Sequence, residues 1–399
     1  MITIDDIQLA RRDIAEFIHR TPLIHSRSLS LLSGAEVYLK LENLQKTGSF
    51  KVRGAFSKLL TVPDQNVIAA SMGNHAQAVA YAAGSLGKHA TIVMPETAAI
   101  VKQEATRGYG AEVILYGDRF NDALDHALSR RDAVFIHPFD DDAVIAGQGT
   151  AALEILEDLK DIDAVLVPVG GGGLIAGIAA AVKSFSSLTQ VIGVQAASAT
   201  SACVSFGVHR VCERVPGNTI ADGIAVGKVG ERTLELMGKH VDSMLTVSED
   251  AIARAILLFL ERKKLVVEGA GAVPLAALLE NMERFRGQRI VLVVSGGNID
   301  FTLIDRIILK GLMMSGRIGV FAVVLDDIAG SLHAVTGIVG THKANIVSVA
   351  HDRTTGDVAI GKAKVVFTVE VRSTEHLASV LAALRDKGYD VRSEAAARD

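Results

Sequence analysis

The feature that most constrains this fold is a regular alternation of short apolar runs with helical segments. The apolar runs begin at Val67, Ala90, Ala111, Ala133, Ala164, Gln190 and Arg289. Helical periodicity covers Ala76–Leu86, Phe120–Arg130, Gln148–Leu159, Leu174–Lys183 and Ala251–Lys263. Strands that are apolar throughout are buried on both faces, so the pattern predicts an α/β fold with two open, mainly parallel sheets flanked by helices. We place a crossing between the two sheets at Gly147–Thr150.

The pattern changes after about Ser315. From Arg317 onward the order of elements becomes strand, helix, strand, strand, helix, strand, which is a ferredoxin-like βαββαβ unit. We therefore predict three domains. Residues 1–40 and 150–315 form a large cofactor-binding domain, residues 41–149 a small domain that closes over substrate, and residues 316–399 a separate C-terminal domain.

Composition argues against several classes of function. The net charge is −4 and no long run of like charge occurs, which disfavours nucleic acid or an acidic membrane surface as the main partner. No segment approaches the roughly 18 apolar residues of a membrane span, and the charged N-terminal stretch does not resemble a signal peptide. Cys203 and Cys212 match no common metal or redox spacing. We expect a soluble, cytoplasmic protein of enzyme size.

A lysine stands at an unusual point of an amphipathic helix. Val52, Phe56 and Leu59 recur at helical spacing, and Ser49 is the predicted N-cap. Lys51 then lies in the first turn, where the helix dipole disfavours a cation by roughly 0.3–1 kcal/mol. The same field makes the neutral amine easier to reach, and a neutral lysine amine is a nucleophile toward carbonyl groups. Taken alone, the stretch also fits an ordinary surface lysine.

Three loops rich in small residues directly follow predicted strands, and they begin at Ser71, Gly170 and Ser295. Ligands of open parallel sheets bind beyond the carboxyl ends of the strands, so these loops are candidate walls of one site. Four consecutive glycines let backbone N–H groups converge, and Leu174 begins a helix whose N-terminus favours an anion. A phosphate is the expected occupant, and a plain turn is the alternative.

The glycine loop also leaves a nicotinamide-dependent oxidoreductase open as an alternative. Gly171, Gly173 and Ala176 satisfy the dinucleotide pattern G-x-G-x-x-[GA]. That function needs an acidic residue at the end of the next strand to bind ribose, whereas this strand ends in Gln195. Motifs of serine hydrolases, zinc proteases and P-loops are missing from the sequence, and His75 is the only histidine inside a candidate loop.

Six motifs in order resemble those of the threonine/serine dehydratases, which are pyridoxal phosphate enzymes of fold type II. The motifs are KTGSFKVRGA, GNHAQ, PVGGGGLIAG, TIADGIAV, EGAGA and SGGNID. The resemblance covers about residues 5–315. It implies pyridoxal 5′-phosphate as cofactor and β-elimination of water from L-threonine, giving 2-oxobutanoate and ammonia. L-Serine would give pyruvate, and a serine-preferring dehydratase remains the alternative within the family.

The resemblance assigns a role to each candidate residue. As the two catalytic residues, Lys51 would hold the cofactor and shuttle the substrate α-proton, and Ser71 would help to bind the substrate carboxylate. The other substrate contacts would come from Gly73, Asn74 and His75. The other cofactor contacts would come from Phe50 and Asn74 at the ring, Gly170, Gly171, Gly172, Gly173 and Leu174 at the phosphate, Gly223 and Glu268 beside the ring, and Ser295 at the pyridine nitrogen. A hydroxyl at that nitrogen leaves it largely unprotonated, which favours elimination over transamination.

Three departures narrow the choice within the family. Related serine racemases carry a second serine where this chain has Met72, which cannot accept a proton, so we expect poor racemisation. The same relatives bind a divalent cation through acidic residues after the strand that here ends in Gln195. This chain reads VQAASATSA there, and we predict no metal site. The sulfhydrylase branch usually has threonine where this chain has His75.

Residues from about Arg317 resemble an ACT domain, a small-ligand regulatory module. Ala329 replaces the usual proline of the first loop, whereas Gly330 and Asn345 stand at their expected places. The resemblance implies a homo-oligomer, as a dimer or tetramer, that responds to an amino-acid effector such as isoleucine or valine. A domain that only assembles subunits is the alternative, because this fold supports many functions.

Overall fold

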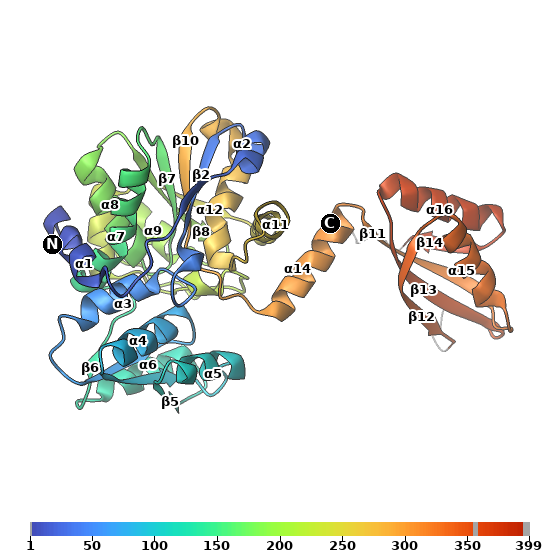
Figure 1. The fold of residues 1–399 in the computed structure, drawn as a ribbon. Coiled ribbons are helices and arrows are strands. Elements are labelled where there is room, and N and C mark those ends of the chain that lie inside the picture. The colour runs from blue at the N-terminus through green and yellow to red at the C-terminus, as the bar shows by residue number, and fades with distance from the viewer. Residues whose placement is uncertain (1, 354–357, 394–399) are drawn as a thin grey trace. The chain divides into compact units, whose positions relative to one another are not determined.

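A computed structural model of the chain describes residues 2–353 and 358–393 (Figure 1). The chain divides into two compact units, residues 1–299 and 300–399, and each is described by itself. Residues 354–357 and 394–399 of the predicted C-terminal domain lie outside the described residues. The division of the first unit into a large and a small domain stays a prediction.

The first unit contains a six-stranded sheet in the order β1-β2-β10-β7-β8-β9. Its strands are β1 (Leu23–His25), β2 (Glu36–Leu41), β7 (Ala164–Pro168), β8 (Gln190–Ala196), β9 (Ser243–Val247) and β10 (Arg289–Val294). Only β1 runs antiparallel to its neighbour; the other pairs are parallel. The apolar runs predicted β7, β8 and β10. They missed β1, β2 and β9, which are very short or carry polar residues that interrupt the apolar pattern.

The second sheet of this unit has four parallel strands in the order β5-β4-β3-β6. Its strands are β3 (Asn66–Ala70), β4 (His89–Met94), β5 (Glu112–Leu115) and β6 (Val134–Phe135), and α4 (Asn74–Ser85) and α6 (Phe120–Ser129) pack on it. Val67 and Ala69 share a core cluster with α4, whereas Ile68 and Ala70 share one with α6. Burial on both faces is the reason that these strands read as continuous apolar runs.

The remaining helices of this unit surround the two sheets (Figure 1). They are α1 (Ile4–Ile14), α2 (Arg27–Ser33), α3 (Lys51–Leu59), α5 (Ile100–Gly108), α7 (Asp142–Asp158), α8 (Gly173–Phe185), α9 (Ser201–Val208), α10 (Glu231–His240), α11 (Glu249–Leu258), α12 (Gly269–Glu280) and α13 (Met282–Phe285). Shorter turns are η1 (Glu42–Leu44), η2 (Asp222–Ile224) and η3 (Phe259–Lys263).

The predicted crossing at Gly147–Thr150 is wrong, because this segment lies inside α7. Its glycines serve close helix packing instead. A Cβ at Gly147 would stand 2.6 Å from the carbonyl oxygen of Arg53 in α3, and one at Gly149 would stand 2.9 Å from that of Gly177 in α8. Glycine is thus required where α7 touches both neighbours.

The start of α3 also differs from its prediction. The helix begins at Lys51 as expected, but the N-cap is Phe50 and no side chain caps it, so the assignment of Ser49 is wrong. The Phe50 N–H instead donates to the carbonyl oxygen of Ser295, at 3.0 Å. A tertiary hydrogen bond to the end of β10 therefore replaces the local cap that the sequence indicated.

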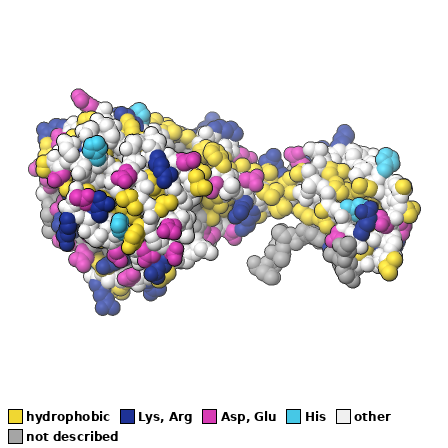
Figure 2. Space-filling model, turned by 90° about the horizontal axis from the view of Figure 1, so that it is seen from below, with side chains coloured by type: hydrophobic (Ala, Val, Ile, Leu, Met, Phe, Trp, Pro, Cys, Tyr) yellow, Lys and Arg dark blue, Asp and Glu magenta, His cyan; other side chains and the backbone are white. Residues whose placement is uncertain are grey.

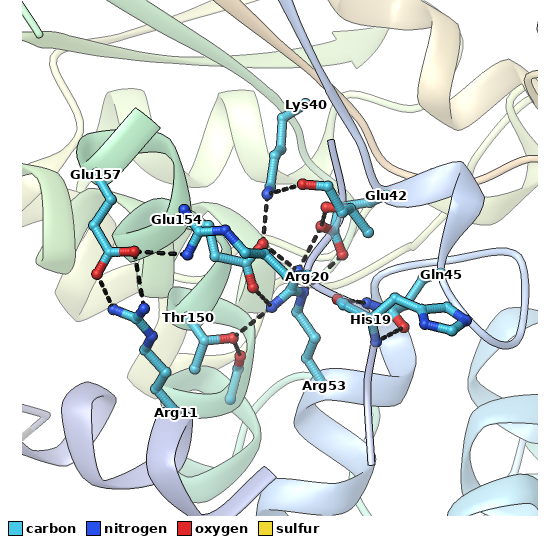
Figure 3. Close-up of polar contacts among 12 residues, drawn as sticks. Arg11, His19, Arg20, Lys40, Glu42, Gln45, Arg53, Thr150, Glu154 and Glu157 are labelled. Carbon is cyan, nitrogen blue, oxygen red and sulfur yellow. Dashed lines mark hydrogen bonds and ion pairs between the residues drawn. The ribbon is translucent and has the colours of Figure 1, made fainter. Parts of the chain in front are cut away.

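A buried ionic cluster lies behind this helix (Figure 3). The guanidinium of Arg53 donates from Nε to Glu42, at 2.8 Å, and from Nη1 to Glu154, at 2.7 Å. Lys40 pairs with Glu154 as well and donates to the carbonyl oxygen of Thr21, at 2.8 Å. The two cations and two carboxylates balance, and they join β2, η1, α3 and α7.

The second unit begins with α14 and continues as a four-stranded antiparallel sheet in the order β12-β13-β11-β14. Its elements are α14 (Phe301–Met314), β11 (Ile318–Asp326), α15 (Ser331–Thr341), β12 (Asn345–Asp352), β13 (Lys362–Glu370), α16 (Thr374–Asp386) and β14 (Asp390–Ser393). The predicted βαββαβ pattern is confirmed. Phe321 and Phe367 stack in its core with ring centroids 5.3 Å apart.

Within the two described ranges, no helix is long and apolar enough to cross a membrane. On the face drawn in Figure 2, acidic and basic side chains are interspersed and form no broad patch of one sign. Long-range attraction of a polyanion to this face is therefore weak.

The buried cluster generates a stability prediction. We expect Arg53→Met to lower the free energy of unfolding by about 3–5 kcal/mol, because it leaves Glu42 buried without its cation. Urea unfolding followed by circular dichroism measures this change. The control is Arg286→Met, whose partner Glu283 is 83% exposed, and which should change stability by about 0.5 kcal/mol or less. An equally small effect at Arg53 would contradict the prediction.

Candidate active site

A cavity of about 950 Å³ lies in the first unit, where loops from both of its sheets meet. Every site residue proposed from the sequence lines it: Phe50, Lys51, Ser71, Gly73, Asn74, His75, Gly170, Gly171, Gly172, Gly173, Leu174, Gly223, Glu268 and Ser295. The fold thus brings together segments that are as much as 245 residues apart, from Phe50 to Ser295. Their individual roles stay predictions.

Lys51 extends into this cavity from the first turn of α3. Its Nζ donates to the carbonyl oxygen of Pro138, at 2.8 Å, and lies 5.3 Å from the centroid of the Phe50 ring. Burial lowers the pKa of Lys51 to about 8, although the charge of Glu268 acts to raise it. Roughly one amine in ten is then neutral at pH 7, against roughly one in several thousand for an ordinary lysine. Burial, rather than the helix dipole invoked from the sequence, is the largest cause.

Glu268 lies at the N-cap of α12 and is 4% exposed, so it is not a surface acid. Its Oε1 accepts a hydrogen bond from Asn74 Nδ2, at 2.8 Å, and Asn74 Oδ1 accepts one from Asn298, at 2.8 Å. Burial raises the pKa of Glu268 to about 7, and the Asn74 hydrogen bond acts to lower it. The chain Asn298–Asn74–Glu268 fixes the orientation of the Asn74 amide.

The glycine loop connects β7 to α8 and faces the cavity with the start of a 13-residue helix. Gly172 has φ +96°, a conformation that side chains strongly disfavour. A Cβ at Gly171 would stand 2.3 Å from the ring of Phe139. Glycine is therefore required on geometric grounds, and the free N–H groups at the helix start form a site for an anion.

The loop after β3 provides a second helix start at the cavity. The N–H of Gly73 donates to Ser71 Oγ, at 3.2 Å, and α4 begins at the next residue, Asn74. The ring of His75 is buried and its Nε2 lies 2.9 Å from the carbonyl oxygen of Ile136. Burial, with a contribution from Lys51, lowers the pKa of His75 to about 3, so this ring is neutral.

The sequence analysis missed the segment that follows β6. The apolar run from Ala133 was expected to continue as a strand, but β6 ends at Phe135, and His137, Pro138 and Phe139 line the cavity. The statement that His75 is the only histidine at the site is therefore wrong. The available signal was Pro138, because proline is excluded from the middle of a central strand.

These residues fit pyridoxal phosphate. The cavity holds a lysine amine of lowered pKa, a glycine loop at a helix N-terminus, and the hydroxyl of Ser295, a residue that is only 2% exposed. Such groups match the aldehyde, the phosphate and the pyridine nitrogen of that cofactor. Within the described residues, no group of three or more His, Cys, Asp or Glu could hold a metal ion.

Known proteins agree with this fit. The family model described as "Pyridoxal-phosphate dependent enzyme" matches residues 14–296. The L-threonine ammonia-lyase of Thermotoga maritima is 48% identical over 400 residues, covering 98% of this chain and 99% of the relative. The L-threonine ammonia-lyase of Geobacter sulfurreducens is 44% identical over 390 residues, covering 96% and 97%. A solved threonine deaminase from the organism abbreviated T.th. is 46% identical and superposes with a TM-score of 0.72, over 75% of this chain and 99% of that chain. The chain therefore belongs to the family of pyridoxal-phosphate-dependent enzymes.

Proposed function

We propose that this chain is a threonine ammonia-lyase, which converts L-threonine to 2-oxobutanoate and ammonia and also acts on L-serine. The observation that carries the proposal is that every residue assigned from the six motifs lines one cavity. The names of relatives that are 44–48% identical over nearly the whole chain support threonine as the substrate. A serine-preferring dehydratase is the alternative, because the two substrates differ by one methyl, worth about 1–3 kcal/mol in a pocket.

The nicotinamide-dependent oxidoreductase is no longer an alternative. The family match spans the glycine loop and most of the first unit, and it identifies a different cofactor. The pattern of Gly171, Gly173 and Ala176 is thus a coincidence of a glycine-rich turn before a helix, which both kinds of enzyme use to bind phosphate.

The residues of the cavity divide the work of elimination. Bound pyridoxal phosphate supplies an aldehyde that captures the amino group and a ring that withdraws electrons from Cα. Lys51 holds that aldehyde before substrate arrives and then accepts the α-proton at Nζ, for which a lowered pKa is suited. The helix start at Gly73, together with Ser71, binds the substrate carboxylate, and the glycine loop binds the phosphate. Ser295 offers the pyridine nitrogen a hydroxyl rather than a carboxylate.

Activity measurements test the proposal directly. We expect 2-oxo acid release from L-threonine and L-serine and little reaction with D-serine. Lys51→Ala should lower kcat by about 10²- to 10⁴-fold, because it removes the proton acceptor. Lys58→Ala is the matched control on the same helix, where Lys58 pairs with Asp141, and it should retain activity. Turnover by Lys51→Ala at the parent rate would contradict the assignment.

The lowered pKa of Lys51 predicts how cofactor binding depends on pH. Only the neutral amine attacks the aldehyde, so the rate at which the apoprotein takes up pyridoxal phosphate should rise with pH and level off above about 8. Stopped-flow absorbance from pH 6 to 10 measures this rate. Glu268→Gln should move the plateau to lower pH, because the charge of Glu268 acts to raise the pKa of Lys51. A rate that still rises steeply to pH 10 would indicate an ordinary lysine.

We further propose that the second unit binds an amino-acid effector and joins subunits into a dimer or tetramer. Its βαββαβ topology supports the resemblance to regulatory modules. The edge strand β12 supports the assembly, since Val347 is 56% exposed and Val349 is 39% exposed there. Cys203 and Cys212 are both free thiols, which is consistent with our proposal of a reducing, cytoplasmic location.

Removal of the second unit tests this regulatory proposal. A chain ending at Ser315 should lose inhibition by isoleucine or valine and form a smaller oligomer, while it keeps threonine turnover. Kinetics with and without each amino acid, combined with light scattering, measures both properties. An unchanged effector response and an unchanged mass would show that the second unit has neither role.

A further inference from the structure

One polar atom of the cavity has no part in the chemistry described so far, and it belongs to His137. The Nδ1 atom of His137 accepts hydrogen bonds from the backbone N–H groups of Phe139, at 3.2 Å, and Asp140, at 2.7 Å. A nitrogen that accepts hydrogen bonds carries no proton, so the neutral ring has its hydrogen on Nε2. Across the part of the chain that the structure describes, Nε2 has no protein partner.

The surroundings of the ring keep this tautomer. Protonation of Nδ1 would set a third N–H against the two backbone N–H groups that now point at it. Burial lowers the pKa of His137, as does the charge of Lys51, whereas Asp140 and Asp141 act to raise it. His137 is therefore a fixed hydrogen-bond donor and not a base.

The position of the ring relates it to the reacting part of the cavity. The next residue, Pro138, accepts the hydrogen bond from Lys51 Nζ, at 2.8 Å. The residue after that, Phe139, packs against Gly171 of the phosphate loop and stacks edge-on with the His137 ring, with centroids 4.7 Å apart. The segment thus lies beside both the amine and the anion site, and His137 itself lines the cavity.

We propose that Nε2–H of His137 donates a hydrogen bond to the β-hydroxyl of the substrate and thereby selects β-hydroxy amino acids. The inference rests on the proposed function, which leaves one polar group of threonine unassigned. The amino group joins the cofactor, and the carboxylate lies at the helix start near Ser71. The hydroxyl then needs a donor, and His137 presents one without a partner.

The contact orients the hydroxyl and does not protonate it. A neutral imidazole N–H is far too weak an acid to give up its proton near pH 7, so His137 does not complete the departing water. Its effect is therefore on which β-substituent is bound and aligned. A site that provides a donor for a substrate hydroxyl discriminates strongly against an analogue that lacks it, because the donor is then left unpaired.

Two substitutions separate this role from the support of the loop. His137→Asn keeps an acceptor oxygen near the position of Nδ1 and removes the Nε2 donor. His137→Gln places an amide N–H near the position of Nε2. The matched control is His209→Asn, at an exposed residue with φ +53°, a conformation that asparagine tolerates.

Each protein, as holoenzyme, is assayed with L-threonine, L-serine and β-chloro-L-alanine. Chloride leaves without a proton and accepts hydrogen bonds weakly, so elimination from the chloro compound does not need the donor. We expect His137→Asn to lose about ten- to a hundredfold in kcat/KM for the two hydroxy substrates. Its kcat/KM for β-chloro-L-alanine and its visible cofactor spectrum should stay near those of the parent, and His137→Gln should recover part of the loss.

The outcomes are distinguishable. Unchanged threonine turnover in His137→Asn would overturn the contact and leave the proposed function intact. Equal losses for all three substrates with an altered spectrum would assign His137 to loop support and also overturn it. Parent enzyme that eliminates chloride but releases no oxo acid from threonine or serine would remove the proposed function, and this inference with it.

Discussion

The geometry of the site depends on how the first turn of α3 is held. On one side of Lys51, the Phe50 N–H is hydrogen-bonded to the carbonyl oxygen of Ser295 at the end of β10. On the other side, the guanidinium of Arg53 is enclosed by the carboxylates of Glu42 and Glu154 (Figure 3). Lys51 lies between these two anchors, so the amine is positioned by a strand end and a buried ionic cluster. A helix secured only by its own cap would leave that position far less defined.

Burial then sets the charge state of the two titratable groups beside the cofactor ring. It lowers the pKa of Lys51 and raises that of Glu268, which moves both groups toward their neutral forms near pH 7. Their mutual attraction opposes this tendency in the lysine. Anions are instead accommodated by backbone N–H groups at the starts of α4 and α8, which carry partial rather than full charges. The cavity can therefore hold a phosphate and a carboxylate while it keeps a nucleophilic amine.

Local patterns predicted much of the fold and the membership of the site. Continuous apolar runs identified β3, β4, β7, β8 and β10, because each is buried on both faces. The same reasoning failed where tertiary contacts overrode local signals. Ser49 has the chemistry of an N-cap, yet a hydrogen bond from the next residue to β10 replaces the cap. Gly147–Thr150 has the composition of a turn, yet it lies within α7 because neighbouring helices approach too closely for a Cβ. His137 was hidden in an apolar run and became visible only once β6 proved to be short.

The sequence by itself determined which chemical groups are available: a lysine at a helix start, a glycine loop after a strand, and the spacing that marks the family. These follow from local rules, since helix periodicity and glycine conformation act over a few residues. Only the tertiary structure decided that Lys51 is buried enough to lose its proton near pH 8, and that Glu268 lies beside it. It also decided that His137 is locked as a donor. Burial and hydrogen-bond partners come from segments far apart in the chain, so no local pattern contains them.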